Sequence, residues 1–329
     1  MRGLVAEQER KYRQREGRPL DYSRAWWTPP LSAAQAWRIE VEQIERKLGL
    51  SPLVSLTDHD SIDAPLLLHV TAADHPAPIS LEWTVPFQRT FFHLGVHNVP
   101  QGAAGELMEA MRRYTAAPRE GSLTELLEVL NADPEILLVL NHPLWDEAGI
   151  GSENHKEVVR AFLGRHGRRL HAVELNGLRC WRENRAVLAL GEALGMPVVS
   201  GGDRHGCEPN AMINLSNACC FAEFVREVRI DRQSHVMLLP QCLEPLGLRC
   251  YEVLRDALSE MPEAAGRERW SDRVFYRLDS GVIASFSEIW GHRPPAVVRY
   301  FVWLVQLFTN PGIRTLMRAA LLRNQEMPS

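Results

Sequence analysis

Between residue 52 and about residue 230, short apolar runs alternate with longer amphipathic stretches, and this alternation leaves few folds open. The pattern predicts six strands, at 52–57, 79–85, 91–96, 136–140, 170–175 and 198–200. It predicts helices between or after them, at 104–114, 123–131, 155–166, 182–194 and 221–228. Strands that alternate with helices build βα units, so we expect an α/β fold with a largely parallel sheet or barrel.

The two ends of the chain follow a different pattern. Segment 1–50 is predicted to be helical, with its clearest helix at 32–48 and an anchored loop around Trp26 and Trp27. Beyond residue 240 the strand pattern fades, and helices are predicted at 243–263 and 295–323. We therefore divide the chain into a helical segment 1–50, an α/β domain 51–240 and a C-terminal helical extension 241–329.

Composition excludes several classes of protein. A formal net charge of −4 disfavours non-specific binding to nucleic acid. The six cysteines contain no C-x-x-C pair, which excludes a zinc ribbon and favours the reduced thiols of a cytoplasmic protein. The N-terminal sequence has no apolar leader, and the longest apolar stretch, 297–308, is interrupted by Arg299 and Gln306 and too short for a membrane span. We expect that stretch to be buried against the barrel or against a partner subunit in a homo-oligomer.

Polar side chains that can bind metals lie at or near the ends of all six predicted strands. Along the chain they are Thr57-Asp58-His59-Asp60, Glu82, His93 with His97, Asn141-His142, Glu174 with Asn176, and the run SGGDRHG that contains Asp203 and His205. In a barrel of βα units these strand ends converge at one rim, where catalytic groups cluster. Imidazole together with carboxylate suits zinc, iron or manganese, and two or three such ions can activate water and hold a phosphoester.

Each of these residues also has a structural interpretation. A single histidine at a strand end is usually structural, and Glu82 alone would pass for an ordinary residue of its strand. The run SGGDRHG is more specific, because glycines before Asp203 allow a tight turn and the close approach of an anionic group. The whole ordered set of residues is more specific than any of its parts. His97 is expected to be structural or to lie behind the metal ligands.

This ordered set resembles the motifs of the PHP (polymerase and histidinol phosphatase) family of metal-dependent hydrolases, over about residues 51–235. SLTDHDSID is similar to the family's second motif, Glu82 and His93 to its glutamate and the histidine of H-L-x-G, NHPLW to its H-P motif, and SGGDRHG to its closing G-S-D-x-H-G. The resemblance implies a distorted (β/α)7 barrel that lacks its first strand here. It also implies one to three divalent ions (Mn, Zn or Fe) and hydrolysis of a phosphorylated small molecule or nucleotide by a metal-activated water.

The resemblance also implies roles for single residues. Glu82, His93 and His142 would ligate one metal, and His59 and His205 another. Glu82 and Asp203 would contribute to the remaining site, with Glu82 bridging. Asp203 and His205 would in addition assist proton transfer.

The sequence departs from the family pattern at its start. Family members open with an H-x-H motif on the first strand, whereas the first histidine of this chain is His59. Three explanations stay open: the true start lies upstream of Met1, the protein works with one or two metals, or it is a degenerate PHP domain without activity.

A phosphoesterase also needs groups that bind phosphate. Arg179 and Arg204 each directly follow a strand-end motif, and the guanidinium fork matches phosphate oxygens. Asn141 and Asn176 are expected either to bind substrate or to orient a ligand histidine, with structural turns as the alternative. We therefore expect a metal-dependent phosphoesterase. A PHP-like binding protein that has lost catalysis and a hydrolase of C–N bonds remain as alternatives.

Overall fold

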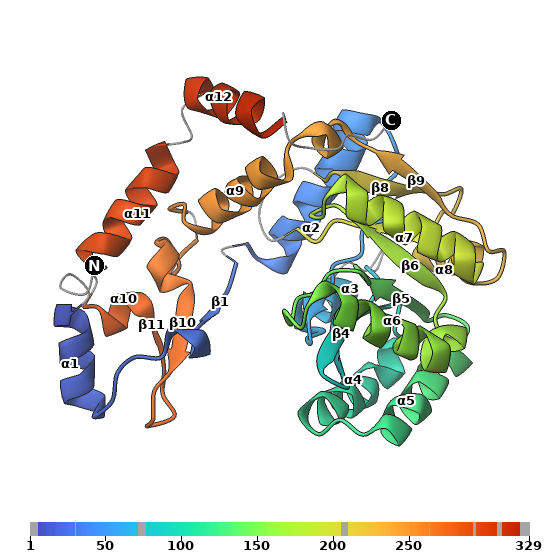
Figure 1. Cartoon of the computed structure of the whole chain (residues 1–329), viewed down its shortest axis with the longest axis horizontal. Coiled ribbons are helices and arrows are strands. Elements are labelled where there is room, and N and C mark those ends of the chain that lie inside the picture. The colour runs from blue at the N-terminus through green and yellow to red at the C-terminus, as the bar shows by residue number, and fades with distance from the viewer. Residues whose placement is uncertain are drawn as a thin grey trace. The chain divides into compact units, whose positions relative to one another are not determined.

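The computed structural model describes residues 6–29, 31–71, 77–204, 210–262, 264–291, 294–307 and 311–322. These residues form two compact units (Figure 1). The larger unit comprises Ala33–Asp203, Pro209–Leu243 and Glu326–Ser329, and the smaller one Met1–Ser32, Arg204–Glu208 and Glu244–Gln325. Each unit is described by itself below.

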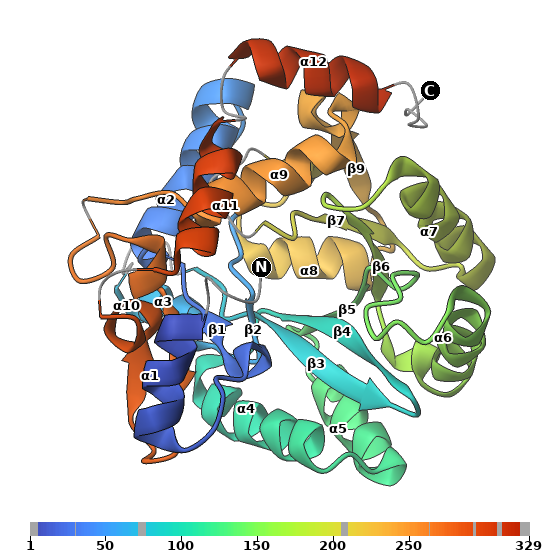
Figure 2. The same ribbon diagram turned by 60° about the vertical axis from the view of Figure 1, so that its left-hand side comes forward.

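The larger unit is built on a six-stranded sheet whose strands follow one another in chain order (Figure 2). The strands are β2 (Asp58–His59), β3 (Leu81–Phe87), β4 (Thr90–His97), β5 (Leu137–Asn141), β6 (Ala172–Asn176) and β7 (Val198–Gly201). The pairs β2–β3, β5–β6 and β6–β7 are parallel, and β4 is antiparallel to both of its neighbours. The sheet curls but stays open, with β2 and β7 at its two edges, so the structure shows a partial barrel of six strands.

The predicted strands are confirmed except for the first. The apolar run 52–57 is not a strand, and β2 begins only at Asp58. Pro52 removes a backbone donor from this run, and the Ser55 hydroxyl bonds the Ser80 hydroxyl at 2.8 Å. The chain therefore joins the sheet only where the polar residues begin.

Helices flank the sheet of the larger unit. They are α2 (Ala33–Glu42), which continues as η2 (Gln43–Leu48), α3 (Asp63–Thr71), α4 (Gln101–Ala116), α5 (Glu120–Ala132), α6 (Ser152–His166), η3 (Gly167–Arg169), α7 (Trp181–Leu194), α8 (Phe221–Arg229) and η4 (Pro240–Leu243). The five helices predicted between 104 and 228 are confirmed, whereas α3 was not predicted. The antiparallel pair β8 (Met212–Leu215) and β9 (His235–Leu238) completes the unit, and Asn214 ties β8 to β7 through two hydrogen bonds with Ser200.

Side-chain alternation gives the two faces of the sheet different chemistry. The outer face carries the main core, formed by residues such as Trp83, Leu94, Leu140 and Val173 with apolar residues of α4, α5 and α6. On the inner face, Leu137, Val139, Ala172 and Val199 pack against α8 through Val225 and Val228. Along β5 and β6 the next inward residues are polar: Asn141, Glu174 and Asn176. These two strands therefore use their first inward positions for packing and their last for polar groups.

The smaller unit contains an antiparallel sheet of β1 (Trp26–Trp27), β10 (Val274–Arg277) and β11 (Ile283–Ser285). Its helices are α1 (Ala6–Glu16), η1 (Tyr22–Arg24), α9 (Leu246–Ala257), η5 (Trp270–Asp272), α10 (Phe286–Ile289), α11 (Ala296–Leu307) and α12 (Pro311–Leu322). Its core joins both ends of the chain, with Tyr12 and Leu20 packed among Tyr276, Phe286 and Trp290. The strands beyond residue 240 were not predicted, because runs of three or four residues give too little periodicity.

Helix α11 coincides with the apolar stretch for which burial was expected. Within the described part of α11 only Val305 is buried, whereas Tyr300 is 60% exposed and Trp303 54%. The smaller unit by itself therefore does not bury this helix, and its burial against the barrel or against another copy of the chain stays a prediction. Among the described helices, none has the length and apolar character needed to cross a bilayer.

Candidate metal centre

Glu82 on β3 is the buried carboxylate around which three histidines gather. Its Oε2 lies 3.6 Å from His59 Nε2, and its Oε1 lies 3.5 Å from His93 Nδ1 and 3.3 Å from His142 Nε2. His93 Nδ1 and His142 Nε2 are themselves 3.2 Å apart. Four of the six residues predicted as metal ligands thus meet at one place, although they are spread over 84 positions of the sequence, from 59 to 142.

Strand register brings these side chains together. His59 pairs with Glu82 across the parallel β2–β3 ladder, and His93 pairs with Asn141 across β4–β5. The turn after β2 is anchored to β3 by Asp60, whose backbone N–H donates to Glu82 O and whose Oδ1 accepts from Thr84 N. The sheet, not a loop, therefore sets the position of the cluster.

A glycine makes room for this arrangement on β4. Gly95 is the register partner of Glu82, and a Cβ at Gly95 would lie 2.6 Å from His97 Nε2 and 3.0 Å from Asn141 Oδ1. Asn141 uses this space to donate from Nδ2 to Glu82 Oε1 at 3.0 Å. Asn141 therefore orients the central carboxylate, whereas substrate or a ligand histidine was expected as its partner.

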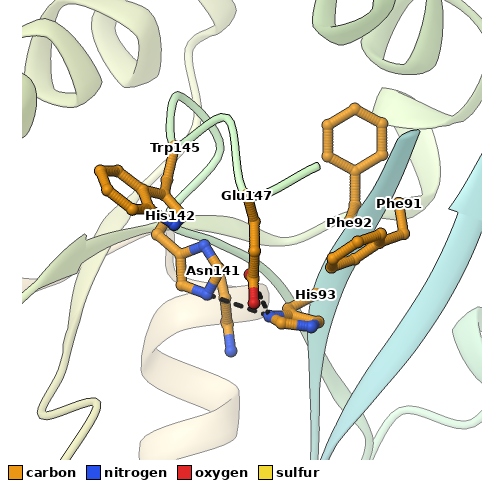
Figure 3. A pocket seen from close by; sticks show the side chains of 7 residues that line it. All are labelled: Phe91, Phe92, His93, Asn141, His142, Trp145 and Glu147. Atoms are coloured by element: carbon orange, nitrogen blue, oxygen red, sulfur yellow. Dashed lines mark hydrogen bonds and ion pairs between the residues drawn. The ribbon is translucent and has the colours of Figure 1, made fainter. Parts of the chain in front are cut away.

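The loop after β5 adds a second carboxylate, Glu147, which was not predicted. Glu147 Oε2 lies 3.6 Å from His93 Nδ1, and Figure 3 shows Glu147 and His142 both directed toward His93. The neighbouring Asp146 shapes this loop by accepting hydrogen bonds from the backbone N–H groups of Ile150 and Gly151. His93, His142, Asn141 and Glu147 then line a pocket whose remaining walls are Phe91, Phe92 and Trp145.

The electrostatics of the cluster favour a bound cation. Burial would raise the pKa of Glu82, but hydrogen bonds from His142 and Asn141 and the nearby His93 and His59 outweigh it and lower that pKa to about 2. Burial lowers the pKa of His93 against the attraction of Glu82. Burial also acts to lower the pKa of His142, but its hydrogen bond with Glu82 and the nearby Glu174 raise that pKa overall. Metal binding requires ionised carboxylates and neutral imidazoles. The shifts of Glu82 and His93 favour these states, whereas His142 must lose a proton before it can bind a metal.

The donor set fits a divalent metal ion. His59, Glu82 and His93 form one group and His93, His142 and Glu147 another, and within each group the ligand atoms lie within 4.8 Å of one another. Imidazole nitrogen with carboxylate oxygen is the ligand chemistry of zinc, iron and manganese. Both groups use the same atom of His93, its Nδ1, which can ligate only one ion, so they are overlapping donor sets for one ion beside His93.

Asp203 lies in a second polar group, linked to the cluster through β6. Asn176 Nδ2 donates to Asp203 Oδ2 at 3.1 Å and to Glu174 Oε2 at 3.2 Å. Glu174 Oε2 in turn accepts the backbone N–H of His142 at 2.9 Å. Burial, reinforced by Glu82 and Asp203 but opposed by His142, raises the pKa of Glu174 to about 7. Glu174 was noted at a strand end but given no role.

The remaining predicted residues have different placements. Arg179 Nη1 lies 3.2 Å from Asp203 Oδ2, and its guanidinium stacks over the Trp145 ring with 4.5 Å to the centroid. Asn176 bonds carboxylates of the chain itself. Arg204 is described with the smaller unit, and His205 lies outside the described residues. His97 is half-buried, with its Nδ1 3.4 Å from Ser55 Oγ, and desolvation lowers its pKa to about 4.

No role was predicted for Glu174 or Glu147, and the sequence contains a signal for only one of these two carboxylates. Glu174 alternates with Ala172 and Asn176 on β6, so the period of two already placed it on the inner face. Glu147 lies in a loop without periodicity, and no pattern in the sequence directs it toward His93. Only the folded loop shows that contact.

No family model matches the sequence, and no curated protein matches it. Among solved structures, the chain is similar to a protein from Bifidobacterium adolescentis described as a "putative metal-dependent phosphoesterase". The two chains are 15% identical, with a TM-score of 0.33, and the match covers 61% of this chain and 91% of the other. A similarity of this size identifies neither fold nor activity, so the case for a metal centre rests on the geometry around Glu82.

Proposed function

We propose that the chain is a metal-dependent hydrolase of the PHP type that cleaves the phosphoester of a small molecule or nucleotide. The observation that carries the proposal is the convergence of His59, His93 and His142 on the buried carboxylate of Glu82. Such a cluster is costly for a fold to keep without a bound cation, because it buries polar and ionisable groups. Its order along the chain matches the PHP motifs.

In this proposal one to three divalent ions are held here: His93 ligates one ion through Nδ1, and Glu82, held in place by Asn141, bridges to a further site. The ions, when bound, would lower the pKa of water and neutralise the charge of the phosphoester. The aromatic walls of the pocket, Phe91 and Trp145, would limit the access of bulk water to the ligands.

The groups assigned to substrate and proton transfer extend the proposal along the strand ends. Asp203 and His205 would exchange protons with the reacting groups, and Asp203 would contribute to a metal site. Arg179 and Arg204 would bind phosphate, and Asn141 and Asn176 would bind other groups of the substrate. Arg179 lies between Asp203 and the Trp145 ring, and this position supports its role in phosphate binding. A short movement of its side chain away from Asp203 would free the guanidinium group to bind phosphate oxygens.

A binding protein without catalysis is the second candidate function. One observation favours it: Arg179 is paired with Asp203, and Asn141 and Asn176 both bond internal carboxylates. Groups that their positions after strand-end motifs suggested for substrate binding are thus engaged within the chain.

One experiment separates these candidates. The purified chain, prepared in medium supplemented with manganese, zinc and iron, is assayed for metal content and for hydrolysis of p-nitrophenyl phosphate and bis-p-nitrophenyl phosphate, with amides as a parallel panel. We expect bound metal, phosphoester hydrolysis, and loss of both in Glu82→Gln but not in His69→Ala, a histidine of α3 outside the cluster. Bound metal without hydrolysis supports the binding protein, and a wild-type chain that holds no metal contradicts both candidates.

A further inference from the structure

Glu174 is a buried carboxylate that the proposed function does not use. It lies on the inner face of β6, between the His142 side of the cluster and Asp203. Its Oε2 accepts two hydrogen bonds, one from the backbone N–H of His142 and one from Asn176 Nδ2. A carboxylate buried on a strand is retained only where such bonds offset its desolvation.

We propose that Glu174 is a positioning residue, which holds His142 in its metal-binding orientation and, through Asn176, fixes Asp203 relative to it. The inference rests on the proposed function, because it assigns His142 and Asp203 to the metal centre. It adds a residue to which neither the family resemblance nor the ligand set gave a role.

The backbone of His142 needs such support. His142 has a φ of 27°, in the left-handed region that side chains other than glycine rarely adopt. Strained backbone of this kind persists only where neighbouring groups over-determine it. The bond from His142 N to Glu174 Oε2 is one such restraint, and it is made at the residue whose ring lies 3.3 Å from Glu82.

The branch toward Asp203 is equally well defined. Asn176 Oδ1 accepts the backbone N–H of Leu178 at 2.8 Å, so its Nδ2 must face the two carboxylates. Asn184 fixes the Asn176 backbone by accepting its N–H and donating to its carbonyl. Asp203, whose own φ is 46°, therefore meets a donor that cannot rotate away. Glu174 and Asn176 thus connect the loop after β5 to the loop after β7.

The chain offers a matched control on the same pair of strands. His171, directly before β6, accepts the backbone N–H of Leu138 on β5 through Nδ1 at 2.9 Å. The contact resembles that of Glu174 in kind, because a buried side chain on or next to β6 accepts a backbone N–H on or next to β5, but it lies at the opposite end of the strands. Glu174→Ala and His171→Ala should therefore cost similar stability and differ only in their distance from the metal centre.

The test measures Mn²⁺ and Zn²⁺ affinity of the full chain by isothermal titration calorimetry, beside thermal unfolding without metal. We expect Glu174→Ala to weaken metal binding by about 10- to 100-fold, as groups that orient ligands do in other proteins. Glu174→Gln, which keeps an acceptor oxygen in the same place, should restore most of the affinity. His171→Ala should bind metal like the wild type at a comparable loss of melting temperature.

Three outcomes overturn the inference. If Glu174→Ala binds metal with wild-type affinity while its melting temperature falls, Glu174 is structural only, and the proposed function stands. If His171→Ala weakens binding as much as Glu174→Ala, the loss reflects general destabilisation. A wild-type chain that binds no divalent metal contradicts the proposed function itself and this inference with it.

Discussion

Gly201 lies directly against the carboxylate of Glu174: a Cβ at position 201 would overlap Glu174 Oε1. The glycines of SGGDRHG predicted the close approach of an anionic group. At Gly201 on β7 the group that approaches is the Glu174 carboxylate of the chain itself. Across the β6–β7 ladder Glu174 pairs with Val199 and Asn176 pairs with Gly201. This register leaves no space for a side chain at position 201. Glycine at position 201 is a packing requirement of Glu174.

This contact predicts the effect of Gly201→Ala. The added methyl group must displace Glu174, so we expect a loss of about 1–3 kcal/mol in the free energy of unfolding, as overpacked cores show, together with weaker metal binding. Urea denaturation and metal titration measure the two effects. Gly105→Ala is the control, because Gly105 lies in α4 with open space around its Cβ position, and alanine there should stabilise the helix by about 0.5–1 kcal/mol. Wild-type stability in Gly201→Ala would contradict the contact.

Divalent metal is predicted to stabilise the larger unit. A ligand that binds only the folded state at 100 times its dissociation constant adds about 2.7 kcal/mol. We therefore expect Mn²⁺ or Zn²⁺ to raise the melting temperature by several degrees and a chelator to reverse the rise. His59→Ala, which removes a half-exposed ligand, should reduce the rise and leave the metal-free melting temperature almost unchanged. An equal reduction in His69→Ala would show that the metal acts elsewhere.

Glu147 provides a test of the second ligand group. It is 43% exposed and contacts His93 from a loop, so Glu147→Gln should leave the stability of the metal-free chain within about 0.5 kcal/mol of wild type. It should nevertheless weaken metal binding, because the amide carries no charge. Glu157→Gln, at an exposed ion pair with Arg89, is the control for a surface charge change. Identical titrations of the two variants would exclude Glu147 from the site.

The pH dependence of stability is predicted to include His171, which lies outside the metal centre. Burial, with Arg229 and Arg232 nearby, lowers its pKa from 6.5 to about 3, and its neutral ring accepts from Leu138 N while facing Asn131 Oδ1. The unfolded chain protonates His171 more readily than the folded chain does. The stabilisation that neutral His171 contributes is therefore fully present above pH 6.5 and is lost as the pH falls toward 3.

The measurement compares urea unfolding of wild type and His171→Gln between pH 7 and 4.5. Each proton taken up only by the unfolded state contributes up to about 1.4 kcal/mol per pH unit, so the wild-type slope should exceed that of the variant by about this amount. The slope that remains includes His97, whose pKa burial lowers to about 4. Equal slopes in the two chains would show that His171 is protonated in the folded state.

Much of the sheet and part of the metal centre could be predicted from local pattern. Apolar runs of strand length located β3 to β7, and the polar residues that end or interrupt them identified His59, Glu82, His93 and His142. Alternation works here because each strand has one face against the core and one facing inward. It failed for β10 and β11, which are too short to show a period, and for the apolar run 52–57, which precedes β2 and is not itself a strand.

The sequence by itself determined which side chains face inward, because strand alternation and the order of the motifs are local properties of the chain. Tertiary structure alone decided which of them meet. Register set His59 beside Glu82 and His93 beside Asn141, and the loop after β5 carried Glu147 to His93. Tertiary structure likewise placed Gly201 against Glu174 and paired Arg179 with Asp203. The physical reason is that these contacts depend on ladder register and loop closure, which couple residues far apart in the chain and leave no periodic trace within either segment.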